Sequence, residues 1–181
     1  MNDAALIQIV DAALSEAARK GGPWLACRIG CTECCMGPFA IASSDAERLR
    51  NGLAELDARD PVRAASVRHR ARAYRRRLER RYPGETVARV LAEEGAADQE
   101  PCPALDPDTG ACDLYSARPI ACRTFGPPIR FAEEDVGVCE LCFQGASDEQ
   151  IEACAVEIPA IRPEEPPALG ESIVGWILAD C

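Results

Sequence analysis

The stretch Cys27-Arg-Ile-Gly-Cys31-Thr-Glu-Cys34-Cys35 places four cysteines within nine residues. Thiolate is the soft ligand that zinc, copper(I) and iron–sulfur clusters select, and a short loop can bring two or three sulfurs to one ion. The spacing therefore predicts a metal site that is essentially all sulfur. Seven further cysteines follow along the chain: Cys102, Cys112, Cys122, Cys139, Cys142, Cys154 and Cys181.

A disulfide framework is the alternative explanation for eleven cysteines. The Ala-rich, amphipathic N-terminal stretch carries Asp3, Asp11 and Glu16, and it lacks the cationic start and unbroken apolar run of a secretory signal. We therefore expect a cytoplasmic protein, whose thiols the cytosol keeps reduced. The odd count also favours metal, as do adjacent Cys34 and Cys35, which cannot bridge each other without strain.

Length and charge bound the fold class. With 181 residues, 48% of them apolar, the chain suits one domain with a real core. No apolar run approaches the ~20 residues that a membrane span needs, so we expect no membrane partner. The net charge of −10 is uneven: residues 59–81 hold ten arginines against Asp60 and Glu79, a net +8, which leaves −18 on the remainder.

Helical signals dominate the first half of the chain. Apolar residues recur at helical spacing from Asp3 to Lys20, and Gly21-Gly22-Pro23 ends that helix. A capping box, Ser44-Asp-Ala-Glu47, predicts a helix through Leu56, and Asp60-Pro61 predicts the start of the next one. That Arg-rich helix should bury one apolar stripe, made of Val67, Ala71, Tyr74, Leu78 and Tyr82.

Shorter elements are expected from Glu85 onward. Residues 85–94 and 147–154 predict short helices, residues 129–138 predict a strand or hairpin, and Glu171–Asp180 predicts a final helix. Asp106–Gly110 and Gly126–Pro128 read as turns, and Pro159–Pro167 as an extended linker.

These elements predict a mainly α fold with irregular cysteine-rich loops and at most a short hairpin, a small domain that metal stabilises. We expect residues 1–158 to form a single cysteine-cluster metal-binding domain with a helical Arg-rich insertion at about 44–95. Residues 159–181 would form the Pro-rich linker and the short C-terminal helix.

A second block of sequence is more specific than any spacing argument. It reads Cys102-Pro-Ala-Leu and then Gly110-Ala-Cys112-Asp-Leu-Tyr115-Ser-Ala-Arg118-Pro119-Ile-Ala-Cys122-Arg123-Thr-Phe125. With Cys31-Thr-Glu-Cys34-Cys35, this block resembles the CxxCxxCC family of YkgJ-like cysteine-cluster proteins. Those are small bacterial and archaeal proteins to which zinc or iron chelation is ascribed. The resemblance covers about 27–37 and 102–125, with a looser echo at Cys139, and says nothing about the Arg-rich insertion.

The resemblance implies where further ligands lie. The family commonly has a cysteine after its second block, so one of Cys139 and Cys142 should complete the site. Its first two cysteines usually enclose two residues, whereas three lie between Cys27 and Cys31, and in this Cys27 departs from the pattern. Eight candidate ligands would serve two four-coordinate metals or one iron–sulfur cluster with spare thiols: Cys27, Cys31, Cys34, Cys35, Cys102, Cys112, Cys122 and Cys139.

Two arginines could tune such a site. Four thiolates around a divalent ion leave a net charge of about −2, which Arg118 and Arg123 are placed to offset or to meet with hydrogen bonds. An ordinary salt bridge explains Arg118 equally well. Cys154 and Cys181 are interpreted as bystanders.

Three classes of function remain open. All-sulfur coordination without an open, water-bearing position favours a structural, metal-handling or sensing site and disfavours an enzyme, with zinc and iron both accepting tetrahedral thiolate. An iron–sulfur enzyme is the alternative, because Cys27-x3-Cys31-x2-Cys34 has the radical-SAM spacing and flagellin lysine methylases carry a related cysteine-rich region. The parallel β/α units of a radical-SAM core are not predicted here.

Nucleic-acid binding through the ten arginines of residues 59–81 is the third class. A solvated helix face that pairs with the acidic remainder explains them better, since the overall charge would repel phosphate. His69 is the sole histidine and is expected to be solvated, so none stands ready to activate Cys34 as a nucleophile. The sequence does not identify a protein partner. We also predict that the two cysteine blocks converge, with Cys31 or Cys34 near Cys112 or Cys122.

Overall fold

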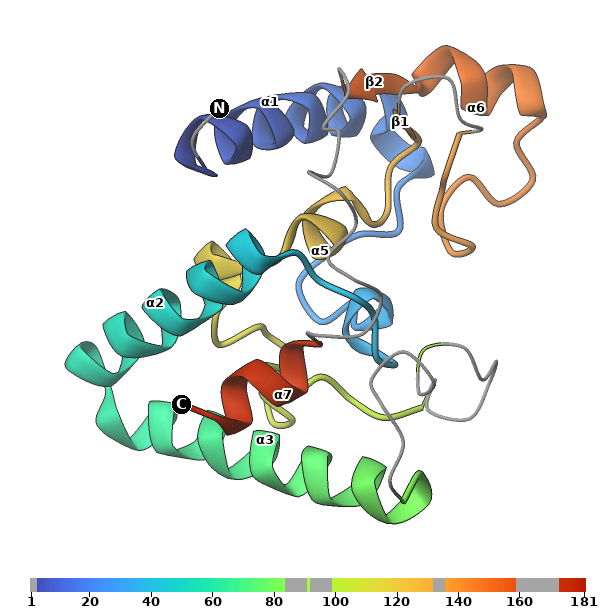
Figure 1. Cartoon of the computed structure of the whole chain (residues 1–181). Helices are drawn as coiled ribbons and strands as arrows, with labels where there is room; N and C mark the ends of the chain where they lie inside the picture. Colours follow the sequence, from blue (N-terminus) through green and yellow to red (C-terminus); the bar gives the residue numbers. More distant parts are fainter. Residues whose placement is uncertain (1–2, 84–90, 92–98, 132–135, 159–172) are drawn as a thin grey trace. The chain divides into compact units, whose positions relative to one another are not determined.

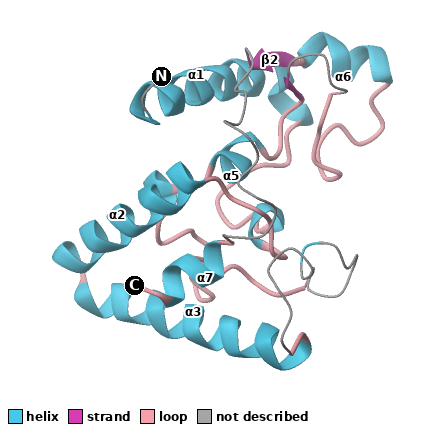
Figure 2. Ribbon diagram, in the orientation of Figure 1, coloured by secondary structure: helices cyan, strands magenta, loops and turns pink. Residues whose placement is uncertain are grey.

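A computed structural model describes residues 3–83, 91, 99–131, 136–158 and 173–181. The described part is mainly α, as predicted, with one pair of very short strands (Figures 1 and 2). The chain divides into two compact units. Unit 1 comprises residues 1–34 and 120–162, and unit 2 comprises residues 35–119 and 163–181. None of the described helices is long and apolar enough to cross a membrane.

Unit 1 is built on helix α1, Asp3–Gly21, which confirms the first predicted helix. The helix packs against the short helix α5, Ile120–Thr124, and against strand β2, Val156–Ile158. Its buried residue Ala17 forms a small core with Ile129 and Ile158. A buried Arg123 of α5 reaches Asp11 of α1 through two contacts of 2.6 and 2.9 Å, which ties α5 to the polar face of α1.

The strands of unit 1 differ from the predicted hairpin. Strand β1, Ile129–Phe131, begins where a strand was expected, and Ile129 makes an antiparallel bridge to Gly137. Its strand partner, however, is β2, which pairs with it in parallel, Ile129 opposite Val156. Three-residue strands carry too little alternation to be read from sequence, so β2 was missed. Between them in sequence, helix α6, Asp148–Cys154, confirms the helix predicted over 147–154 and starts at a capping box of Ser147 and Gln150.

Unit 2 is a helical layer of α2, Ser43–Arg59, α3, Pro61–Arg81, and α7, Val174–Ala179, which lie side by side (Figure 1). Asp60 caps α3 as predicted: its Oδ1 accepts from the Arg63 N–H at 3.0 Å. The capping box predicted for α2 is wrong. The helix begins at Ser43, and the Asp45 carboxylate accepts from the Ala42 N–H at 3.2 Å, while alanine has no side-chain acceptor to return.

The core of unit 2 confirms the apolar stripe predicted for α3. Every residue of the stripe is buried, and the Tyr74 ring packs so closely on Gly175 of α7 that a Cβ there would lie 2.3 Å from it. Gly52 of α2 meets Ala117 in the same way, at 2.3 Å. Glycine at these two positions lets α7 pack closely on α3, and the 3-10 turn Tyr115–Ala117 on α2. The buried stripe comprises Val67, Ala71, Tyr74, Leu78 and Tyr82.

Two predicted segments, the helix over 85–94 and the linker over 159–167, lie outside the described residues, apart from Leu91, which is helical. The final helix is shorter than predicted, since α7 spans Val174–Ala179. Ile173 stands just before it as the N-cap and bridges to Ala40 in antiparallel fashion. This bridge joins the C-terminal segment to the chain that leads into α2.

Candidate metal centre

Two loops of unit 1 are joined around the first cysteine. The Phe143 N–H donates to the Trp24 carbonyl at 2.9 Å, and the two aromatic rings stack with centroids 6.0 Å apart. The Cys139 N–H donates to the Gly126 carbonyl at 3.1 Å. These contacts hold the segment before Cys27 against the 139–143 turn, although more than a hundred residues separate them in sequence.

Four thiols gather where these loops meet, and we call them the thiol cluster: Cys27, Cys31, Cys139 and Cys142. The Cys142 thiol lies close enough to those of Cys27 and Cys139 to interact with both, which opposes the ionisation of either. Cys31 and Cys139 both lie close enough to Cys27 to act on it electrostatically. Cys139 is 9% exposed and Cys142 only 5%, packed with Phe143, Leu25 and Ile151.

Without a bound cation, the surroundings of the thiol cluster disfavour the thiolate form of its cysteines. Although the residue Cys27 is exposed overall, its sulfur points into the fold, and burial of that sulfur, with the repulsion of Cys142, Cys31 and Cys139, raises the pKa of Cys27 to about 12. Burial also raises the pKa of Cys139, against the opposing effect of the Leu141 N–H. A positive ion among these sulfurs would reverse both effects, because it attracts each thiolate.

Gly126 makes room for the Cys27 sulfur. Its φ is +122°, a backbone conformation that side chains rarely adopt, and a Cβ added there would lie 2.6 Å from Cys27 Sγ. The predicted Gly126–Pro128 turn therefore does more than reverse the chain. It lets the sulfur sit against bare backbone beside the loop that carries Cys139.

In unit 2 the backbone brings three other predicted ligands into one neighbourhood. The Cys102 N–H donates to the Cys35 carbonyl at 2.7 Å, beside a bridge between Met36 and Pro101. A second bridge joins Leu105 and Cys112, and the Leu105 N–H returns to the Cys102 carbonyl at 2.9 Å. The two cysteine blocks thus meet along the backbone at Cys35 and Cys102. The predicted approach of Cys31 or Cys34 to Cys112 or Cys122 stays a prediction.

Helix α3 holds this cysteine loop in place. The Asp113 carboxylate, next to Cys112 and 1% exposed, receives ion pairs from Arg63 and Arg70 of α3. Arg70 also donates from Nε to the Pro103 carbonyl at 2.9 Å, next to Cys102. Further along α3, Arg77 pairs with Glu100 at 2.8 Å. Part of the Arg-rich helix is therefore a brace for the second cysteine block, a role that its charge pattern did not indicate.

The remaining predicted site residues lie as follows. Cys34 belongs to the short 3-10 turn Glu33–Cys35, and Cys122 belongs to α5. Arg118 stacks on the Tyr115 ring with its guanidinium carbon 3.6 Å from the ring centroid, and Arg123 pairs with Asp11. Of the two presumed bystanders, the Cys154 thiol donates to the Lys20 carbonyl and the Cys181 thiol to the Ile177 carbonyl.

All eleven cysteines are free thiols in the structure. Across residues 3–83, 91, 99–131, 136–158 and 173–181, no three His, Cys, Asp or Glu side chains are already arranged to hold a metal ion. The thiol cluster is therefore a gathering of donors and not a finished coordination sphere. His69 is exposed on α3, away from the thiols of unit 2 that its helix braces.

Sequence reasoning missed three residues of these sites. It expected one of Cys139 and Cys142 at the site, whereas the structure places both in the thiol cluster. The CxxC spacing itself was the available signal, because two cysteines three positions apart in a turn can face one point. Gly126 and Asp113 carried no such signal, since their roles depend on partners distant in the sequence.

Comparison with known families supports the interpretation of the motifs. The model of the CxxCxxCC family, described as a "putative zinc- or iron-chelating domain", matches residues 26–143. No curated protein and no solved structure matches the chain. The matched segment runs from the residue before Cys27 to the residue after Cys142, and thus encloses the whole thiol cluster and the cysteine loop braced by α3. Because it covers well over half of the sequence, the chain belongs to the CxxCxxCC family.

Proposed function

We propose that the chain binds zinc or iron through the thiol cluster of Cys27, Cys31, Cys139 and Cys142, and that the bound metal is structural. The observation that carries this proposal is the position of Cys142, whose thiol interacts with those of Cys27 and Cys139 where backbone hydrogen bonds join two loops. The four sulfurs come from two loops far apart in sequence. A metal that crosslinked those loops would therefore contribute its binding free energy to the folding of unit 1.

The chemistry of the donors fits either metal. Four soft sulfur ligands suit tetrahedral zinc, and they equally suit iron or an iron–sulfur cluster. Because Cys139 and Cys142 are buried among apolar side chains, a metal held there would have little room for the exchangeable water that hydrolytic sites require. Modest rotation of the side chains would bring these neighbouring sulfurs into coordinating positions.

The other predicted ligands are Cys34, Cys35, Cys102, Cys112 and Cys122. We propose that the three of them in unit 2, Cys35, Cys102 and Cys112, form a second group of donors. Support comes from unit 2, where the backbone already holds Cys35, Cys102 and Cys112 in one neighbourhood. The stoichiometry of bound metal tests this point, since one centre and two centres differ by a factor of two for zinc.

The experiment that tests the function is purification without oxygen, followed by elemental analysis and a visible spectrum. Colourless protein with stoichiometric zinc would support a zinc centre, and brown protein with iron and sulfide would support a cluster. Removal of the metal by a chelator should lower the melting temperature of the chain, because a structural metal is part of the folded state. A protein purified metal-free that binds neither ion after reduction would refute the proposal.

Replacement of Gly126 by alanine should weaken metal binding about tenfold. The new Cβ would lie 2.6 Å from Cys27 Sγ in a backbone conformation that alanine strains to adopt, so the sulfur must move off its position. The measurement is competition with a chromophoric chelator. Gly137→Ala is the matched control, since its Cβ would meet nothing nearer than the Ile129 carbonyl at 3.9 Å. Equal affinities for the two variants would contradict the placement of Cys27.

A further inference from the structure

Eight of the nine arginines of α3, all but the terminal Arg81, divide into two sets. The arginines of one set form ion pairs with carboxylates of unit 2: Arg63, Arg68, Arg70, Arg75 and Arg77. The other set follows one face of the helix. Within the described residues, Arg72, Arg76 and Arg80 are exposed and make no hydrogen bond or ion pair, and neither does His69. We call these four residues the basic row.

Helix geometry places the basic row on a single line. Steps of three, four and four residues return to the same face, so the four side chains follow one another over about 16 Å. Thirty acidic residues against twenty lysines and arginines make carboxylates abundant in this chain. The neighbouring arginines form ion pairs with carboxylates of the same chain. The basic row has no carboxylate partner in the part of the chain that is described. Such a row is complementary to negative charge supplied from outside.

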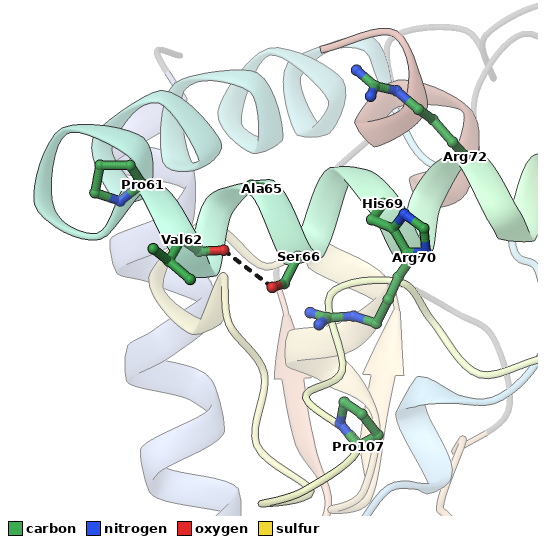
Figure 3. Close-up of a pocket in the computed structure, with 8 residues that line it drawn as sticks. All are labelled: Pro61, Val62, Ala65, Ser66, His69, Arg70, Arg72 and Pro107. Atoms are coloured by element: carbon green, nitrogen blue, oxygen red, sulfur yellow. Dashed lines mark hydrogen bonds between the residues drawn. The ribbon is translucent and has the colours of Figure 1, made fainter.

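A groove continues from the N-terminal end of the row. It has a volume of about 820 Å³ and is open to solvent, between the first turns of α3 and the loop that carries Pro107 (Figure 3). Figure 3 shows Arg70 extended from the helix toward Pro107, while Arg72 points away from that loop. The lining includes Pro61, Val62 and Ala65, and Val62 is 78% exposed. An apolar side chain could shield this surface from water.

We propose that the basic row and its groove form a docking surface for an acidic peptide segment of a partner protein. The carboxylates of the segment pair with Arg72, Arg76 and Arg80, and an apolar side chain next to them enters the groove beside Val62. Carboxylates at every fourth position of a partner helix would match the spacing of the three arginines. This surface is independent of the metal proposal, since no thiol belongs to it.

The same charges favour a peptide over nucleic acid. His69 is the one aromatic side chain among the residues of the row and the lining of the groove, so bases would find little to stack on there. The net charge of −10 repels a polyanion at a distance, whereas a short peptide brings few charges. An apolar pocket beside the arginines also has no counterpart in a sugar–phosphate chain.

The test is a binding titration of the full chain with a fluorescein-labelled helical peptide of about 16 residues. The peptide carries glutamate at every fourth position and leucine near one end, and its fluorescence anisotropy reports binding at about 50 mM salt. The triple variant Arg72→Gln, Arg76→Gln and Arg80→Gln should raise Kd about tenfold, since three exposed charge pairs are lost. The matched control Arg28→Gln, Arg50→Gln and Arg59→Gln loses the same charge at exposed positions outside α3 and should change Kd less than twofold.

Two further arms decide between occupants. Val62→Ser should weaken binding of the leucine-bearing peptide about threefold and leave binding of a version with glutamine in place of leucine unaffected.

In the second arm, a labelled single-stranded oligonucleotide of similar length is titrated in parallel. Tighter binding of the oligonucleotide that is lost in the triple variant would overturn the peptide proposal in favour of nucleic acid. Equal Kd for both triple variants, or no binding of the peptide at low salt, would also overturn it. Should the triple variant not fold, Arg76→Gln alone should still raise Kd about twofold.

Discussion

Replacement of Cys142 by serine should weaken metal binding by about 100-fold or more. Zinc bound by clustered thiolates carries an apparent binding free energy of about 10–16 kcal/mol, so loss of one sulfur in four should cost at least ~3 kcal/mol. Cys142 is the residue whose thiol interacts with those of both Cys27 and Cys139, so its replacement removes the sulfur that lies close to both. Competition with a chromophoric chelator under reducing conditions measures the change in affinity.

Cys154→Ser is the matched control for this experiment. Cys154 packs in the same small core as Cys142, but its thiol donates to the Lys20 carbonyl, and we do not propose it as a ligand. Its substitution should change metal affinity less than threefold. If Cys154→Ser lost metal while Cys142→Ser kept it, the proposed ligand set would be wrong.

The second large effect is expected on stability. Asp113→Ala should lower the free energy of unfolding by about 3 kcal/mol, because it removes the buried carboxylate that two arginines share. Arg63 and Arg70 are partly exposed and can turn toward water, which keeps the cost at the lower end of the range for broken buried pairs. Urea denaturation of the metal-free protein measures it, without a contribution from bound metal.

Asp57→Ala provides the control, since it removes one carboxylate of the same unit with a single arginine partner, Arg68. That carboxylate is 44% exposed, so its loss should destabilise the chain much less than the loss of the Asp113 carboxylate. Asp113→Ala should also make the Cys102 and Cys112 thiols react faster with a thiol reagent, because α3 then no longer anchors their loop. Equal destabilisation by both substitutions would show that α3 does not brace the cysteine loop.

Local patterns predicted the helices well because their determinants lie within a few residues. Asp60 followed by Pro61 set the start of α3, and the spacing of Val67, Ala71 and Tyr74 indicated its buried face. The prediction failed at α2 where a neighbour competed: Asp45, which also pairs with Arg48, replaced the expected Ser44–Glu47 box. Strand β2 escaped detection because three residues show no period of their own.

The amino-acid sequence by itself determined the family, the mainly α class and the soft-donor chemistry of the chain. These depend on residue types and short spacings, which survive in any fold that the chain adopts. Only the tertiary structure decided which thiols share a neighbourhood, that Gly126 accommodates the Cys27 sulfur, and which arginines of α3 are satisfied. These contacts join residues that lie scores of positions apart in the sequence. Which of them form depends on the packing energy of the whole unit, and short sequence patterns do not contain it. Arginines of α3 that look alike in sequence therefore become a brace for the cysteine loop or, within the described residues, an unpaired row along one face of the helix.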